Sequence, residues 1–117
     1  MTGHPGPDPG TSYIMENMSH VYIMASKHNG TLYIGATSNL SQRTSQHKGG
    51  KITGFSKKYS VNKLVYYEGC GTLAQAMKRE RQLKNWKRSW KIELVEKLNP
   101  NWDDLYTKIQ KNNVEGS

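Results

Sequence analysis

The sequence predicts an α/β fold: a small central antiparallel three-stranded sheet flanked by helices, in one domain. Two runs rich in β-branched and aromatic residues, 21–25 and 31–35, flank the turn dipeptide Asn29-Gly30, a pattern typical of a β-hairpin. A third such run, 63–69, is followed by segments whose apolar residues recur with the helical period. A chain of 117 residues suffices for one modest core and not for two.

Each strand of the hairpin carries one tyrosine, Tyr22 on the first strand and Tyr33 on the second. Side chains alternate along a strand, so each tyrosine faces away from its aliphatic neighbours. We expect the aliphatic side chains to enter the core and both phenols to lie on the opposite face.

A helix is predicted directly after the hairpin, with Ser38 or Asn39 as its N-cap. Leu40, Arg43 and His47 recur at helical spacing and therefore share one face. Because Leu40 is the only apolar residue of this helix, we expect that face to point inward, toward the tyrosines.

Residues 48–62 then form a long basic loop. We expect Lys57, Lys58 and Tyr59 to contact a phosphate backbone and a base face, because cations beside an aromatic ring suit single-stranded or distorted nucleic acid. A solvated loop without a ligand is the alternative.

The third strand, 63–69, has apolar side chains at successive positions. Alternation predicts Leu64 with Tyr66 on one face and Val65 with Tyr67 on the other. We therefore expect this strand to be covered on both faces and to lie within the sheet.

Thr72 caps a helix that runs to about Trp86, and a carboxylate falls within its apolar stripe. The stripe consists of Leu73, Ala76, Met77, Glu80 and Leu83. An unpaired buried charge is costly, so Glu80 needs a cation, a hydrogen-bond network or a metal. A salt bridge to Arg43 or to a basic residue of its own helix is the alternative to metal binding.

A further helix is predicted from Ser89, and Asn101 is expected to cap a last one over residues 102–109. Asp103 and Asp104 would complement the dipole of that last helix rather than bind a metal. Three tryptophans are expected to be packing anchors rather than platforms for base stacking. They are Trp86, Trp90 and Trp102.

The net charge of +8 is concentrated in the middle of the chain. Residues 42–91 contain thirteen Lys or Arg and two acidic residues. Such clustering predicts a polyanionic partner, DNA or RNA, whereas a basic surface without a ligand is the alternative. The side chains predicted to contact nucleic acid are Lys48, Lys51, Lys57, Lys58 and Lys84.

A single cysteine, Cys70, excludes an internal disulfide and a cysteine-rich zinc site. No apolar run approaches the length of a membrane span, and we expect a cytoplasmic protein. Residues 1–17 contain three of the four prolines, and we expect them to be a disordered leader or a remnant of an expression vector. Residues 18–110 are expected to form the domain and 111–117 a flexible tail.

The order of these features resembles the GIY-YIG nuclease domain. Residues 33–35, Tyr-Ile-Gly, match the second half of the signature, and ten residues separate Tyr22 from Tyr33. In the first half, His20 and Val21 stand where the family has glycine and isoleucine. The resemblance covers roughly residues 18–109 and is closer to the small stand-alone bacterial proteins of this superfamily.

The resemblance implies a role for each matching residue. It makes Tyr22 the general base, Tyr33 a group that orients water or phosphate, and Arg43 the clamp on the scissile phosphate. His47 would receive or relay the proton of Tyr22. Glu80 matches the single carboxylate that binds Mg²⁺ or Mn²⁺.

The family also has a downstream asparagine near the phosphate. Asn85 and Asn99 are both candidates for that position, and neither is assigned.

The resulting hypothesis is a divalent-metal-dependent endonuclease that hydrolyses DNA phosphodiester bonds, in DNA repair or processing. A non-catalytic module that binds DNA or RNA through the same basic surface is the alternative. A third possibility is an adaptor whose tryptophan-bearing C-terminal helices dock another protein, and it predicts an exposed apolar patch there.

Overall fold

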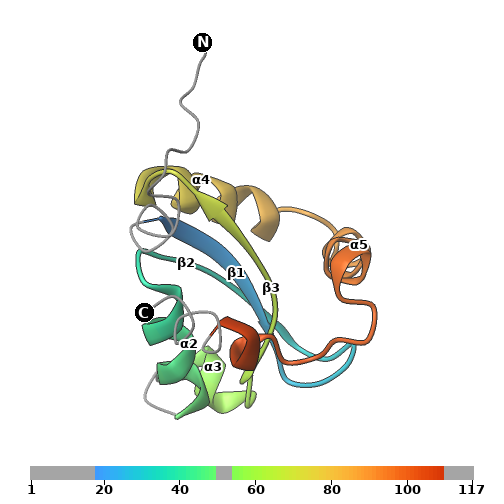
Figure 1. Cartoon of the computed structure of the whole chain (residues 1–117). Helices are drawn as coiled ribbons and strands as arrows, with labels where there is room; N and C mark the ends of the chain where they lie inside the picture. Colours follow the sequence, from blue (N-terminus) through green and yellow to red (C-terminus); the bar gives the residue numbers. More distant parts are fainter. Residues whose placement is uncertain (1–17, 50–53, 110–117) are drawn as a thin grey trace.

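A computed structural model of the chain describes residues 18–49 and 54–109. Its centre is a three-stranded antiparallel sheet, which confirms the predicted fold class (Figure 1). The strands are β1 (Ser19–Ala25), β2 (Leu32–Thr37) and β3 (Lys63–Cys70), in the order β2-β1-β3. The predictions for residues 1–17 and 111–117 lie outside the described residues.

The hairpin β1–β2 forms as predicted, but the place of the third strand differs. The central strand is β1, which pairs with both neighbours, so the prediction that β3 lies inside the sheet is wrong. Both faces of β3 are nevertheless covered, since Leu64 and Val65 are fully buried.

The helices are α2 (Leu40–Lys48), α3 (Phe55–Lys58), α4 (Leu73–Lys84) and α5 (Arg88–Leu98). Figure 1 shows α2 and α5 on opposite sides of the sheet. None of the described helices has the length and apolar character needed to cross a lipid bilayer.

Each face of the sheet is covered by its own buried cluster, as side-chain alternation predicts. The α4–α5 core contains Val21, Ile23, Ala25, Ile34, Val65, Tyr66, Leu83, Val95 and Trp102. The tyrosine-side core contains Tyr22, Met24, Leu40, Val61, Leu64 and Ile109, with Tyr33 packed against it. The aliphatic positions of the hairpin therefore meet α4 and α5, and both phenols lie on the side of α2.

A register shift in the β1–β3 pairing corrects the predicted faces of β3. Ile23 lies opposite Tyr66 and the next residue, Met24, lies opposite Leu64, which leaves Val65 as the extra residue of a bulge. Val65 and Tyr66 consequently both join the α4–α5 core. Beyond the bulge, Tyr67 turns to the opposite face.

The C-terminal segment also departs from its prediction. No helix starts at Trp102, because that residue adopts a left-handed backbone conformation with φ 57°. Its fully buried indole enters the α4–α5 core, and its Nε1 donates to Glu96 Oε2 at 2.7 Å. Helical backbone begins only at Tyr106, whose N–H donates to Asp104 Oδ1 at 3.1 Å.

Gly35 is required by the close approach of a tyrosine ring. Gly35 lies opposite Tyr22 on the neighbouring strand. A Cβ at position 35 would lie 2.5 Å from the Tyr22 hydroxyl oxygen and 2.6 Å from its Cζ. The Tyr22 ring is only 1% exposed and has no room to retreat.

Gly35→Ala should therefore lower the free energy of unfolding by about 1–3 kcal/mol, the usual cost of overpacking a core. Urea unfolding followed by circular dichroism would measure the change. Gly69→Ala is the matched strand control, because its Cβ would meet only the flexible side chain of Met18. Equal losses in the two variants would contradict the contact with Tyr22.

Candidate active site

A buried pair of side chains, Tyr22 and His47, joins the central strand to α2. The Tyr22 hydroxyl oxygen lies 3.1 Å from His47 Nε2, and both side chains are buried. Their rings meet edge to face, with centroids 5.7 Å apart. This contact makes His47 part of the inward face of α2, as its spacing from Leu40 predicts.

The N-cap of α2 fixes where the helix begins and therefore which of its residues face the sheet. Asn39 is the N-cap, and its Oδ1 accepts from Gln42 N at 3.1 Å. Leu40, Thr44 and His47 are the buried residues of the helix. Thr44 satisfies its own hydroxyl by donating to the Leu40 carbonyl oxygen at 2.8 Å.

Tyr33 completes a cluster of three rings. Its ring centroid lies 5.0 Å from that of His47 and 6.3 Å from that of Tyr22. Tyr33 is half-buried, whereas Tyr22 is only 1% exposed, so an attacking water would enter beside Tyr33 to meet the Tyr22 hydroxyl.

Arg43 and Glu80 bring opposite charges to this cluster. Arg43 is exposed on α2, so the expectation that it points inward with Leu40 and His47 is wrong, and Thr44 takes the third buried position of that face. The Arg43 charge nevertheless acts on the pKa of both Tyr22 and His47. The charge of Glu80 on α4 also acts on Tyr22. The side chain of Glu80 is 22% exposed, and its Oε2 pairs with Lys84 Nζ at 2.8 Å. This pair is the salt bridge within its own helix that the sequence analysis gives as the alternative to metal binding.

Burial keeps both members of the central pair neutral at pH 7. It raises the pKa of the Tyr22 phenol above its ordinary value, and Tyr33 and the Glu80 charge add to this rise while Arg43 opposes it. Burial, with the Arg43 charge second, lowers the pKa of His47 to about 4. With its proton on Nδ1, His47 accepts a hydrogen bond from the Tyr22 hydroxyl at Nε2.

Comparison with known proteins agrees with this arrangement: residues 18–93 match the GIY-YIG catalytic domain. The chain belongs to the GIY-YIG family.

Similar proteins include a UPF0213 protein of Staphylococcus haemolyticus, 35% identical over 66% of this chain and 93% of the relative. A UPF0213 protein of Syntrophus aciditrophicus is 36% identical over 70% of this chain and 93% of the relative. These relatives are small bacterial proteins, as the resemblance predicted. No solved structure matches.

GIY-YIG nucleases typically use a divalent metal, and Glu80 is the acidic residue whose charge acts on Tyr22. The described residues contain no group of three His, Cys, Asp or Glu side chains that would hold an ion by themselves. Mg²⁺ keeps several of its waters and binds through one or two carboxylates together with substrate phosphates. Glu80 fits such a shared site, provided that Lys84 releases it.

His20, at the position of the first glycine of the GIY-YIG signature, is a buried side chain on the same strand face as Tyr22. Its ring meets that of Tyr67 edge to face at 5.9 Å. Burial lowers the pKa of His20, and its Nδ1 has no hydrogen-bond partner in the described part of the chain. The sequence showed this residue only as a departure from the signature.

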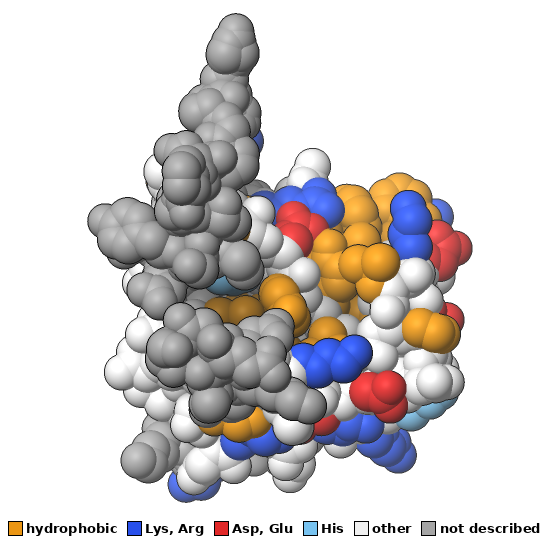
Figure 2. All heavy atoms as spheres, in the orientation of Figure 1, with side chains coloured by type: hydrophobic (Ala, Val, Ile, Leu, Met, Phe, Trp, Pro, Cys, Tyr) orange, Lys and Arg blue, Asp and Glu red, His pale blue; other side chains and the backbone are white. Residues whose placement is uncertain are grey.

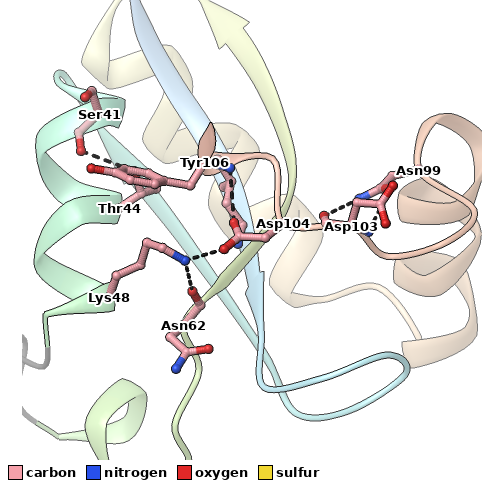
Figure 3. Close-up of polar contacts among 9 residues, drawn as sticks. Ser41, Thr44, Lys48, Asn62, Asn99, Asp103, Asp104 and Tyr106 are labelled. Carbon is pink, nitrogen blue, oxygen red and sulfur yellow. Dashed lines mark hydrogen bonds and ion pairs between the residues drawn. The ribbon is translucent and has the colours of Figure 1, made fainter. Parts of the chain in front are cut away.

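Lys48 has a partner that the sequence did not reveal. Its ammonium pairs with the Asp104 carboxylate and donates to the Asn62 carbonyl oxygen at 3.1 Å (Figure 3). Asp104 Oδ1 also accepts from Leu64 N at 3.1 Å, so one carboxylate ties the end of α2 to β3. The predicted contact of Lys48 with nucleic acid competes with this network.

The other predicted nucleic-acid contacts are distributed over several elements. Lys57 and Lys58 are exposed on α3, and the Lys58 ammonium lies 5.4 Å from the ring centroid of Tyr59. Lys84 is on α4, paired with Glu80. Lys51 lies outside the described residues.

Asn99, one candidate for the downstream asparagine, is held in the fold. Its buried Nδ2 donates to the Val65 carbonyl oxygen at 3.0 Å, and its Oδ1 accepts from Asp103 N at 3.0 Å. These bonds give Asn99 a structural task between α5 and β3. Asn85, the other candidate, is exposed at the C-cap of α4.

The low pKa of His47 should make stability depend on pH. Between pH 6.5 and about 4 the unfolded chain binds a proton at His47 and the folded chain does not. The free energy of unfolding should therefore fall as pH is lowered through this range, by up to about 3 kcal/mol from this residue. Urea unfolding of wild type and His47→Gln across the range would measure it. An unchanged slope in His47→Gln would contradict the low pKa of His47.

The Lys48 network predicts a contrast between two lysines. Lys48→Met should lower the free energy of unfolding by about 1 kcal/mol, because it leaves the Asp104 carboxylate without its cation. Lys58→Met, at an exposed lysine of α3, should leave the free energy of unfolding unchanged, and urea unfolding would measure both variants. Equal stability of both variants would contradict the structural task of Lys48.

Proposed function

We propose that this chain is a divalent-metal-dependent endonuclease that hydrolyses DNA phosphodiester bonds, in DNA repair or processing. The observation that carries the proposal is the Tyr22–His47 pair at 3.1 Å, with the charges of Arg43 and Glu80 acting on the same phenol. Membership of the GIY-YIG family and the net charge of +8 support it.

The proton path follows from the neutral state of both buried side chains. A phenol whose pKa is raised is a poor base alone, so Tyr22 must release its own proton as it takes one from water. His47 Nε2 lies within reach to receive the Tyr22 proton. The resulting hydroxide attacks phosphorus, the P–O bond to the leaving oxygen breaks, and that oxygen takes a proton from solvent. Tyr33, at the solvent side of the rings, orients the water or the phosphate.

Arg43 is the side chain that binds the scissile phosphate. Its exposed guanidinium can donate two parallel hydrogen bonds to phosphate oxygens, and its charge offsets the negative charge of the transition state. Glu80 would hold Mg²⁺ or Mn²⁺, which when bound supplies positive charge at the leaving oxygen. Flanking phosphates would meet Lys57, Lys58, Lys84 and Lys51.

A non-catalytic module for DNA or RNA is the second candidate, and one observation favours it. The Glu80 carboxylate is occupied by Lys84, and a permanent pair would leave no ligand for a metal. Both candidates fit a cytoplasmic protein with one free cysteine, Cys70.

Cleavage of labelled duplex, flap, branched and single-stranded DNA with Mg²⁺ or Mn²⁺ tests the proposal. Arg43→Ala, Glu80→Gln and His47→Gln should each lower the cleavage rate by about 100-fold or more, since each removes a group used in the transition state. Arg81→Ala, at an exposed arginine of α4, is the matched control and should cleave normally.

Lys84→Met adds a test of the metal ligand. Freeing the Glu80 carboxylate should lower the Mg²⁺ concentration needed for half-maximal cleavage. If the wild type cuts none of these substrates but binds them in a salt-dependent manner, the binding module is the better description. If Glu80→Gln cleaves like the wild type, the assignment of the metal ligand fails.

A further inference from the structure

An aromatic hollow lies at the junction of α4 and α5, away from the two tyrosines. It has a volume of about 310 Å³ and is lined by Trp86, Trp90, Glu93, Leu94 and Lys97. Figure 2 shows hydrophobic side chains gathered over this junction at the upper right, with cationic and acidic side chains beside them. Trp86 and Leu94 pack against the α4–α5 core, whereas Tyr22 belongs to the core on the opposite face.

The two tryptophans form a corner that is open to solvent. Their ring centroids are 5.9 Å apart and their planes cross at 83°. Trp90 is 47% exposed, so the expectation that all three tryptophans are packing anchors is wrong for Trp90 and confirmed for the buried Trp102. A flat ring can stack on the Trp90 face while its edge meets Trp86.

Cations surround this corner. The Lys87 ammonium lies 5.6 Å from the Trp90 ring centroid, and the Arg79 guanidinium carbon lies 5.3 Å from that of Trp86. Lys97 lines the hollow itself, and Arg79 also donates to the Glu68 carboxylate at 2.7 Å. An apolar protein surface docked here would strip water from these charges without compensating them, whereas a polyanion with flat rings complements both the cations and the indoles.

We propose that the hollow binds an unpaired nucleobase from a single-stranded DNA segment. The base stacks on Trp90, and Lys87 and Lys97 meet the flanking phosphates. Glu93 accepts hydrogen bonds from an amino group on the base edge, which favours adenine, cytosine and guanine over thymine. The hollow would bind such a base whether or not the chain cleaves DNA, so this proposal goes beyond the proposed nuclease.

The test is equilibrium binding in EDTA, where metal-dependent cleavage cannot occur. The probes are a blunt DNA duplex and the same duplex with a single-stranded overhang that carries the fluorescent adenine analogue 2-aminopurine. Wild type should bind the overhang duplex more tightly, and stacking on an indole should quench the analogue. Trp90→Ala should weaken overhang binding about tenfold and abolish the quenching while leaving affinity for the blunt duplex unchanged.

Two variants separate stacking from loss of structure. Trp90→Phe keeps an aromatic face and should keep most of the overhang preference. Leu98→Ala, at a residue of α5 that is 76% exposed and outside the hollow, should bind like wild type. Thermal unfolding by circular dichroism checks that each variant is folded.

Salt dependence gives an independent readout. Lys97→Met should reduce the dependence of log Kd on log salt concentration, because one phosphate contact is lost, whereas Trp90→Ala should not. If folded Trp90→Ala binds and quenches the overhang probe like wild type, the proposal is overturned and a protein partner becomes the occupant to seek. Equal wild-type affinity for the blunt and overhang probes, without quenching, would overturn it as well.

Discussion

The Tyr22 ring lies in the middle of the central strand, across Gly35 and against His47, and the arrangement of α2 depends on that contact. Since β1 is buried on both faces, a side chain as large as tyrosine fits only where the neighbouring strand offers no Cβ. The bond to His47 then sets the rotation of α2 about its own axis. With His47 turned inward, Arg43, one turn earlier, is carried to the exposed rim of the same cluster.

In this arrangement, the pKa of His47 would depend on whether a phosphate is bound at Arg43. Burial and the Arg43 charge together hold the pKa of His47 near 4, so the imidazole of the free protein is a weak proton acceptor. In the proposed function, a phosphate bound to Arg43 would bring negative charge close to His47 and offset the arginine, which would raise the pKa of the imidazole. His47 would therefore become a stronger proton acceptor once a substrate phosphate is in place, and proton transfer would be limited to the loaded site.

The features predicted correctly from sequence are those encoded by near neighbours. The Asn29-Gly30 turn, the alternation around Tyr22 and the shared face of Leu40 and His47 all follow from spacing within one or two elements. The features that were missed depend on distant partners. The bulge at Val65 arises from pairing with β1, and in sequence Lys48 is indistinguishable from Lys58 until Asp104, fifty-six positions later, is placed beside it.

Trp102 was predicted in the wrong backbone conformation for the same reason. Its surroundings in sequence, Asn101 and two aspartates, are typical of a helix start, and local propensity alone favours that reading. Burial of the indole against the α4–α5 core outweighs that preference and draws the backbone into a left-handed turn.

Neighbouring residues of α4 interact with different partners. Glu80 acts on Tyr22 and pairs with Lys84, whereas Arg79 donates to the Glu68 carboxylate at 2.7 Å and lies over Trp86. Successive residues of a helix point about 100° apart, so Glu80 and Arg79 leave α4 in different directions and reach different partners. Because α4 is joined to the sheet through the fully buried Leu83, both side chains are fixed to the same rigid frame as Tyr22. In the proposed function, a nucleic acid that met both the hollow and a metal at Glu80 would therefore contact two points anchored to this one helix, and the span between them would select which strand geometries engage both.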